Sequence, residues 1–511
     1  MSYRGSEFPF FDFSGGLATN KPASNIEPNE AQNLRNLLIT VGKGIQKKQG
    51  NTTFNSTAMA SGAAVTGLFY FKLLGGSDFL VAAAGSSIFK SDALDGTMDD
   101  ITGAVVVTSN QNNLWTASQM NDLAIFVGGA PNPPFKYSGT GNAADLGGTP
   151  PSGTFGFSHN NRMFIGNTAA NPSLISWSTL GNPEDWSGTG SGSQQIEKND
   201  GDVLVGAAPI NIDNVVLFKQ NSIHTFLTRT SPFPYYPIFK GVGAVGKRAI
   251  VTVDGMVYFI TADGQMRMTD GSKVYDQTDF PRLGNIDDIW ASLNQSRLQY
   301  ITGFYESGVG YDHVVWLCSS ASSSTNDLAL VWDIRNKCWL RHTQGYKANS
   351  AARTQSGIIY TGHYDGKIYK QGVTSEFNNA SETAPGAIDS YWGSCWHKLN
   401  SLTDSFKFDV INVALTSQTS GFLTIGYGFN YVTDAYTESK SMQAAGDQWD
   451  AMLWDQGIWG GQGDVVKNIF TKGRGINAQV SFRNNNAGET FTIHGYSFLM
   501  KKTGRKIFSI R

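Results

Sequence analysis

The stretch MVYFITADGQMRMTDG, residues 256–271, contains the unit that decides the fold of this chain. Its apolar start is followed by the turn sequence Ala-Asp-Gly and then by a second short run that ends in Asp-Gly. Gly and Asp favour tight turns, and apolar runs bounded by such turns are typical of strands. The stretch therefore predicts a β-hairpin.

The same unit recurs along the chain between about residues 60 and 375. Besides the stretch quoted above, the copies are FLVAAAGSSIFKSD (79–92), LAIFVGGAPNPPFKYSG (123–139), MFIGNTAANPSLISWS (163–178), VVLFKQNSIHTFLT (215–228), HVVWLCSSASSSTNDLALVWD (313–333) and IIYTGHYDGKIYKQG (358–372). Their second strands recur every ~47 residues on average, which matches the ~40 to 50 residues of one propeller blade.

A β-propeller also solves a physical problem that these hairpins share. An isolated two-stranded hairpin is marginally stable in water, whereas four-stranded blades packed face to face bury both faces of each sheet. We therefore expect an all-β chain with a propeller of about seven blades over residues 58–375, and six or eight blades also fit. An irregular β-sandwich is the alternative, because the last two spacings between hairpins are uneven.

Composition supports a β-rich globular protein and excludes several other classes. The 511 residues include 58 glycines and 12% aromatic residues, a pairing that suits tight turns and pleated strands. Three scattered cysteines, Cys318, Cys338 and Cys395, are too few for a disulfide scaffold and suit a reducing compartment. A formal charge of −2 excludes a strongly basic nucleic-acid binder.

Both ends of the chain lack the repeat. In residues 1–57, helix-start signals around Pro28 precede Ala31, Leu34 and Leu38 at helical spacing, so we expect a short helix in an N-terminal arm. Residues 376–403 are polar and predict a linker. Period-two alternation in stretches such as FLTIGYGF, residues 422–429, predicts a C-terminal β-sandwich platform over residues 404–511.

Motifs for catalysis or cofactor binding are weak in this sequence. GVGAVG, residues 241–246, matches G-x-G-x-x-G, but it precedes a strand pattern where a dinucleotide site needs a helix, so we interpret it as a turn between blades. There is no G-x-S-x-G, no H-E-x-x-H and no phosphate-binding loop. We expect no catalytic residue, no cofactor and no metal, and therefore no enzyme.

One enzyme class stays open as an alternative. Glycoside hydrolysis needs only two suitably spaced carboxylates, and the chain has 41 acidic residues. Propellers host such enzymes, although the sialidase box S-x-D-x-G-x-x-W is missing. The alternative function is therefore a carbohydrate-binding or glycoside-hydrolysing propeller protein.

Candidate contact residues lie outside the repeated hairpins. They belong to a Gly- and Ser-rich stretch, to an aromatic-rich loop at residues 448–463 and to a basic end without acids; they are Trp186, then Trp449, Trp454 and Trp459, then Lys501, Lys502, Arg505 and Lys506. Aromatic and basic side chains are common anchors at interfaces. The sequence shows no secretory signal and no apolar run of the ~20 residues that a bilayer requires, so we expect a cytoplasmically made protein without a membrane span.

Three stretches carry a resemblance to a known family. They are FSGGLATNKPASNIEPNEAQNLRNLLITVGKGIQKKQGNTTF (13–54), the glycine-rich turn with its following strands (241–271), and GRGINAQVSFRNNNAGETFTIHGYSFLMKKT (473–503). In these stretches the chain resembles the tail-hub or nozzle proteins of short-tailed bacteriophages, which are also described as packaged-DNA stabilisation proteins.

This resemblance implies a structural virion protein assembled in the host cytoplasm. Six copies would form a ring below the portal and the head-to-tail adaptor, with tail fibres or spikes as further partners, and DNA would pass through the lumen without sequence-specific binding. The low charge fits such a role, because every phosphate that a wall neutralises adds binding that passage must break. The family carries no catalytic residues to transfer.

Overall fold

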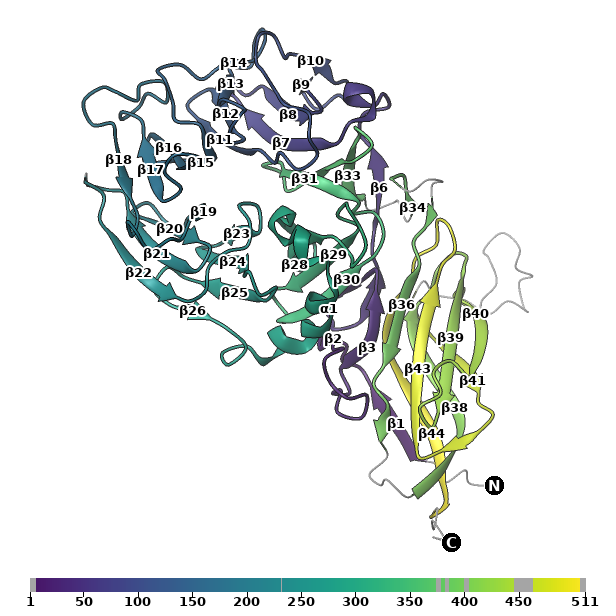
Figure 1. The fold of residues 1–511 in the computed structure, drawn as a ribbon. Coiled ribbons are helices and arrows are strands. Elements are labelled where there is room, and N and C mark those ends of the chain that lie inside the picture. The colour runs from purple at the N-terminus through teal and green to yellow at the C-terminus, as the bar shows by residue number, and fades with distance from the viewer. Residues whose placement is uncertain are drawn as a thin grey trace.

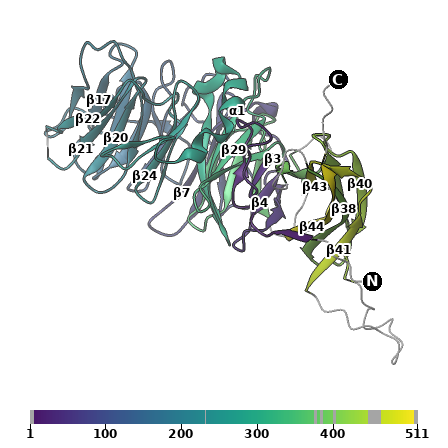
Figure 2. The same cartoon turned by 90° about the horizontal axis from the view of Figure 1, so that it is seen from below.

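The computed structural model describes residues 6–230, 232–373, 378–381, 386–398, 404–444 and 463–505 (Figure 1). Strands dominate these residues, and they form a β-propeller and a pair of larger sheets beside it. Figure 2 shows the propeller on one side of the molecule and the two larger sheets on the other. The predicted all-β propeller is thus confirmed.

Each of the first six blades is an antiparallel four-stranded sheet of consecutive strands. The first three blades are β7 (Val65–Lys72), β8 (Asp78–Ala84), β9 (Ser87–Asp92) and β10 (Asp99–Asp100); β11 (Thr116–Met120), β12 (Leu123–Val127), β13 (Phe135–Tyr137) and β14 (Ala144–Asp145); and β15 (Gly153–His159), β16 (Arg162–Thr168), β17 (Leu174–Trp177) and β18 (Gly192–Gln195). The next three are β19 (Leu204–Pro209), β20 (Asn214–Lys219), β21 (Ser222–Leu227) and β22 (Tyr235–Lys240); β23 (Ile250–Val253), β24 (Met256–Ile260), β25 (Met266–Thr269) and β26 (Val274–Tyr275); and β27 (Thr302–Gly308), β28 (Tyr311–Cys318), β29 (Leu328–Asp333) and β30 (Cys338–His342).

The seventh blade is closed by a strand from the N-terminal part of the chain. Strands β31 (Ala348–Arg353), β32 (Ile359–His363) and β33 (Ile368–Val373) pair in order, and β6 (Gly50–Thr53) adds to β33 as the fourth strand. Short strands β34 (Asn378–Asn379) and β35 (Gly386–Ala387) extend this sheet. The innermost strands contact one another around the ring, and β31 packs against β7, so the circle contains seven blades. The blade count expected from the spacing is confirmed.

Helical turns are few and short. The 3-10 turn η1 (Met59–Gly62) precedes the first blade, and η2 (Pro281–Ile286), α1 (Asp287–Ser292) and η3 (Gln295–Tyr300) lie between the fifth and sixth blades. Leu283, Ile286 and Trp290 of this helical insertion are buried in the largest hydrophobic core. The insertion therefore packs between the propeller and the N-terminal strands.

The two larger sheets combine strands from both ends of the chain. We call them sheet A and sheet B. Sheet A contains β1 (Ser6–Phe10), β4 (Leu37–Ile39), β5 (Ile45–Lys47), β38 (Asp404–Thr416), β41 (Asp464–Phe470), β42 (Arg474–Gly475) and β44 (Thr492–Arg505). Sheet B contains β2 (Gly16–Leu17), β3 (Glu30–Arg35), β36 (Ser390–Ser394), β37 (His397–Lys398), β39 (Phe422–Phe429), β40 (Tyr436–Ser441) and β43 (Asn477–Asn484).

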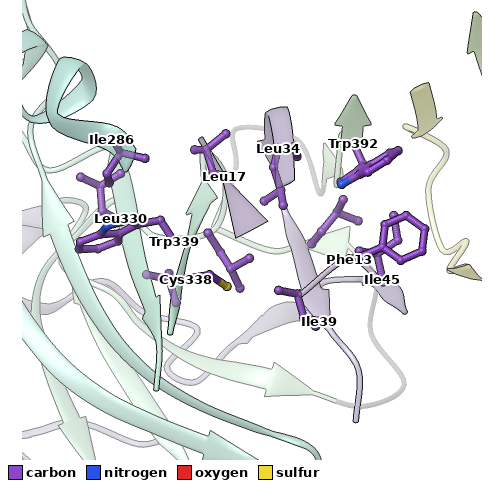
Figure 3. Close-up of a cluster of buried hydrophobic side chains, with 14 of the residues drawn as sticks. Phe13, Leu17, Leu34, Ile39, Ile45, Ile286, Leu330, Cys338, Trp339 and Trp392 are labelled. Carbon is purple, nitrogen blue, oxygen red and sulfur yellow. The ribbon is translucent and has the colours of Figure 1, made fainter. Parts of the chain in front are cut away.

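Aromatic side chains pack between sheets A and B. Trp392 of sheet B lies with its ring centroid 5.7 Å from that of Tyr496 in sheet A, and Phe408 of sheet A stacks on Phe429 of sheet B at 4.8 Å. Together with Phe13 these rings belong to the same buried cluster as Leu17, Cys338 and Trp339 (Figure 3). The core of the paired sheets is therefore continuous with the core of the sixth blade.

The short N-terminal helix predicted from Ala31, Leu34 and Leu38 is wrong. Residues Glu30–Arg35 form β3, which pairs with β36, and Leu37–Ile39 form β4, which pairs with β5. Asn36 between them has a positive φ of 56°, which turns the chain from one sheet to the other. Tertiary pairing with strands more than 350 residues later overrides the local helical spacing.

Two predicted boundaries also shift. Residues 376–403, predicted as a linker, contain β36, which pairs with both β3 and β43 inside sheet B. The sequence predicts the β-sandwich over residues 404–511 and leaves open whether the N-terminal arm joins it; sheets A and B both include strands from the first 47 residues. The polar composition of 376–403 hides β36 because its buried SYWGS strand mixes small polar and aromatic residues.

Gly50 offers a test of propeller closure by β6. A Cβ at this position would lie 1.9 Å from the backbone oxygen of Asn378, so Gly50→Val forces β6 away from β34. We expect the free energy of unfolding to fall by ~1–3 kcal/mol, as measured by urea unfolding. Gly75→Val is the matched control, since nothing lies within 4 Å of a Cβ there. Equal stability of the two variants would contradict the close packing of β6 against β34 in the seventh blade.

Candidate functional site at the propeller axis and its flanking surfaces

The G-x-G-x-x-G stretch is a crossing between two blades, as interpreted from the sequence. It joins β22 of the fourth blade to β23 of the fifth, and Gly241 has a positive φ of 97°. A Cβ on Gly243 would lie 1.9 Å from the backbone oxygen of Lys219, and one on Gly246 would lie 2.4 Å from that of Gln299. Glycines at these two positions let the crossing pass close to neighbouring backbone, with no helix behind it to bind a pyrophosphate.

The crossing places Arg248 at the meeting point of the innermost strands. Its guanidinium donates from Nε to the carbonyl oxygen of Trp115 at 2.9 Å and from Nη1 to that of Asn349 at 2.9 Å. Nη2 donates to the carbonyl oxygens of Thr66 and Trp115. These carbonyls come from the first, second and seventh blades, so one side chain from the fifth blade crosses the axis and ties four blades together.

Lys247 extends the same arrangement to the third blade. Its Nζ donates to the carbonyl oxygen of Thr154 at the start of β15, at 2.6 Å. The residue as a whole is half-buried, and protein atoms surround its ammonium group. This desolvation lowers the pKa of Lys247 to about 7, and burial lowers the pKa of Arg248 to about 9. Burial of both cations therefore costs desolvation free energy, which their hydrogen bonds to carbonyl oxygens offset.

Polar side chains complete the network around Arg248. Asn349 accepts at its carbonyl oxygen from Thr302 Oγ1 at 3.0 Å and donates from Nδ2 to the carbonyl oxygen of Gln111 at 2.8 Å. Tyr364 donates from its hydroxyl to Asn349 Oδ1 at 3.2 Å. The side chains of this network are cationic, amide and hydroxyl groups, and all partners of Arg248 are backbone carbonyls. A pair of carboxylates for glycoside hydrolysis is not found among them.

A buried carboxylate ties the propeller to sheet B. Glu30 of β3 is 1% exposed, and its carboxylate accepts from Lys21 Nζ at 2.7 Å and from Asn285 Nδ2, in the helical insertion, at 2.9 Å. Its other oxygen accepts from the backbone N–H of Glu27 at 3.0 Å. Nearby, Trp339 donates from Nε1 to the carbonyl oxygen of Leu283. The propeller and sheet B are therefore joined by buried packing and hydrogen bonds.

Trp186 has an intramolecular role in the structure. It is partly buried against the cluster of Met120 and Leu146, and its Nε1 donates to the carbonyl oxygen of Pro183 at 3.0 Å. The Gly- and Ser-rich stretch that follows Trp186 contains β18, the outermost strand of the third blade. Trp449, Trp454, Trp459 and Lys506 lie outside the described residues.

The basic C-terminal residues are only partly described. Lys501, Lys502 and Arg505 belong to β44 of sheet A. Lys501 Nζ lies 3.9 Å from Asp409 Oδ2, and Lys502 is exposed. Sequence reasoning thus selected surface and terminal residues but missed Lys247 and Arg248. The signal was present, since two adjacent cations directly follow a glycine crossing and precede an innermost strand.

The described part of the chain contains neither a metal-binding cluster nor a membrane-spanning helix. No group of three or more His, Cys, Asp or Glu side chains there is arranged to hold a metal ion. Within the same residues, no helix has both the length and the apolar character needed to cross a bilayer.

The order of the strands in the sheets defines a seven-bladed β-propeller. No family model and no curated protein matches the chain. Among solved structures it is similar to streptogramin B lyase, with 12% identity, a TM-score of 0.42 and coverage of 63% of this chain and 97% of that one. The WD40 β-propeller domain of Doa1 is similar at 11% identity, with a TM-score of 0.40 and coverage of 66% and 99%. YCF48 from Cyanidioschyzon merolae is similar at 11% identity, with a TM-score of 0.39 and coverage of 63% and 98%.

Removal of the axial guanidinium tests how much it stabilises the ring. Arg248→Met keeps an unbranched side chain but leaves three buried carbonyl oxygens without this donor, so we expect the free energy of unfolding to fall by ~2–3 kcal/mol in urea titrations. Arg229→Met is the control, because Arg229 is largely exposed and its Nη1 lies 3.6 Å from Asp213. That change should cost less than ~1 kcal/mol. Similar losses for both variants would refute the axial role.

Lys247 gives a pH test with a defined sign. Its folded pKa of about 7 lies below its ordinary value of 10.5, so the unfolded chain binds more protons between these values. Stability contributed by this group therefore rises as pH increases through that window. We expect the melting temperature of the wild type relative to Lys247→Met to increase from pH 7 to pH 9, measured by scanning calorimetry. A constant difference over this range would show that the ammonium is not desolvated.

Proposed function

We propose that this chain is a structural virion protein of a phage tail. Six copies would form a ring-shaped nozzle or hub below the portal and adaptor, retain packaged DNA and conduct it during ejection. The observation that supports this most is the packed and hydrogen-bonded joint between the propeller, whose axis Arg248 crosses, and the two sheets, which contain strands from both ends of the chain. Such a unit is better suited to be a subunit of a mechanically stressed ring than to be an enzyme that turns over a ligand.

In this proposal the conduit lies between copies and not along the axis of one propeller, which Arg248 crosses. A duplex cannot pass along a propeller axis where one guanidinium is hydrogen-bonded to three other blades. In the proposed ring, the lumen is therefore enclosed by neighbouring chains, and heterologous contacts between different patches close the circle. The weak net charge of −2 keeps the binding of phosphates low along such a wall.

Partners in this proposal follow from the same ring. The portal or head-to-tail adaptor would contact one end and tail fibres or spikes the periphery, all in the virion after assembly in the host cytoplasm. A carbohydrate-active propeller is less well supported, because its chemistry needs two carboxylates about 5–10 Å apart in a pocket. At the axis, this chain presents Lys247 and Arg248.

The oligomeric state with its expected neighbours tests the proposal. The chain would be co-expressed with the portal and adaptor genes of its genome and analysed by native mass spectrometry and negative-stain electron microscopy. We expect six copies in a ring attached to the adaptor, and only weak, sequence-independent binding of short duplex DNA at physiological salt. A 55.3 kDa monomer in the presence of both rings, or a gene remote from portal and capsid genes, would overturn the proposal.

A further inference from the structure

One face of the propeller carries a pocket between the third and fourth blades. In each blade the first and second strands, and the third and fourth, are joined at the same face, because all four strands alternate in direction. The pocket is built from four such connections: the turn before β16, the segment after β17, the turn before β20 and the segment after β21. Its volume is about 330 Å³.

The floor of this pocket is apolar and fixed. Phe233 is 2% exposed and packs against Trp177 with ring centroids 4.8 Å apart. Arg162 lies 5.9 Å over the Phe233 ring, and its Nη1 donates to the carbonyl oxygens of Ser178 and Gly190, both at 2.7 Å. A guanidinium anchored through one nitrogen keeps its charge at the pocket in a set orientation.

The rim exposes two large aliphatic side chains. Leu180 is 66% exposed and Ile212 is 75% exposed. The turn that carries Ile212 is held in place, because Asn160 donates from Nδ2 to the Ile212 carbonyl oxygen at 2.6 Å. The side chain is thus presented to solvent by an ordered backbone, and adjacent exposed apolar groups at a concave site favour a protein partner.

Charge at the pocket selects the chemistry of that partner. Arg162 and Arg229 both line it, and Asp213 is the one acidic side chain among its lining residues. Arg229 is 79% exposed, and its Nη1 lies 3.6 Å from Asp213 Oδ2, a distance typical of a weak surface pair. One positive charge therefore remains in excess beside Leu180 and Ile212, and a carboxylate next to an apolar side chain complements this set.

We propose that this pocket docks an extended segment of a different protein that carries an apolar side chain beside an acidic one. The apolar side chain would pack between Leu180 and Ile212 over Phe233, and the carboxylate would accept from Arg162 and Arg229. The same propeller face exposes aliphatic residues at two other hairpin turns, Leu74 before β8 and Val309 before β28. Further contacts along the face would raise the affinity of a long partner. This inference concerns a separate surface and stands whether or not the chain forms a ring.

Peptide binding tests this inference directly. Fluorescein-labelled GSGDLEGLDGSG is the probe, and two matched peptides replace its acids by lysine or its leucines by serine. Fluorescence anisotropy should show the acidic, leucine-containing peptide binding the full chain at least tenfold more tightly than either control. Equal binding of the three peptides, or none by the first, would overturn the proposal.

Variants locate the binding site on the protein. Ile212→Asp and Arg229→Glu change exposed side chains, and each should weaken binding of the probe at least tenfold while circular dichroism stays unchanged. Val466→Asp, an exposed position on sheet A, is the matched control and should bind as the wild type does. Unchanged binding by both pocket variants would overturn the proposal. If Ile212→Asp instead abolishes self-association in sedimentation velocity, a second copy occupies the pocket and the assignment to a different protein is wrong.

Discussion

The pairing of β6 with β33 is the interaction on which the rest of the structure depends. It joins residues about 320 positions apart, so the seventh blade has its fourth strand only when the N-terminal part of the chain is in place. The same N-terminal residues supply five strands to sheets A and B before they reach the propeller. One closing strand therefore fixes the position of the propeller relative to both sheets.

Closure of the ring determines what the centre can do. Backbone carbonyl oxygens from the first, second and seventh blades lie close together at the axis, and Arg248 donates hydrogen bonds to all three blades at once. Arg248 therefore stabilises the ring of blades from its centre, and the pocket proposed to dock a partner lies apart from it, between the third and fourth blades.

Sequence patterns predicted the elements whose signals are local. The hairpin with ADGQ, for example, forms β24 and β25, and the glycines at 241–246 form a crossing because no substituted residue fits beside the backbone of Lys219 and Gln299. The errors arise where distant residues decide. Ala31 and Leu34 have helical spacing, but they lie in β3, which pairs with the distant strand β36. Lys247 and Arg248 gain importance only once seven blades meet, which no local window contains.

The distance in sequence between paired strands also sets an order of events during synthesis. Ile45 of β5 pairs with Ile493 of β44, so about 450 further residues must be made before this part of sheet A can form. At the usual ~5–20 residues per second this takes roughly 20 to 90 seconds. During that time the propeller blades can assemble while β1 to β5 lack their C-terminal partners. Their apolar side chains are then open to chaperones, or to the same strands of a neighbouring nascent chain.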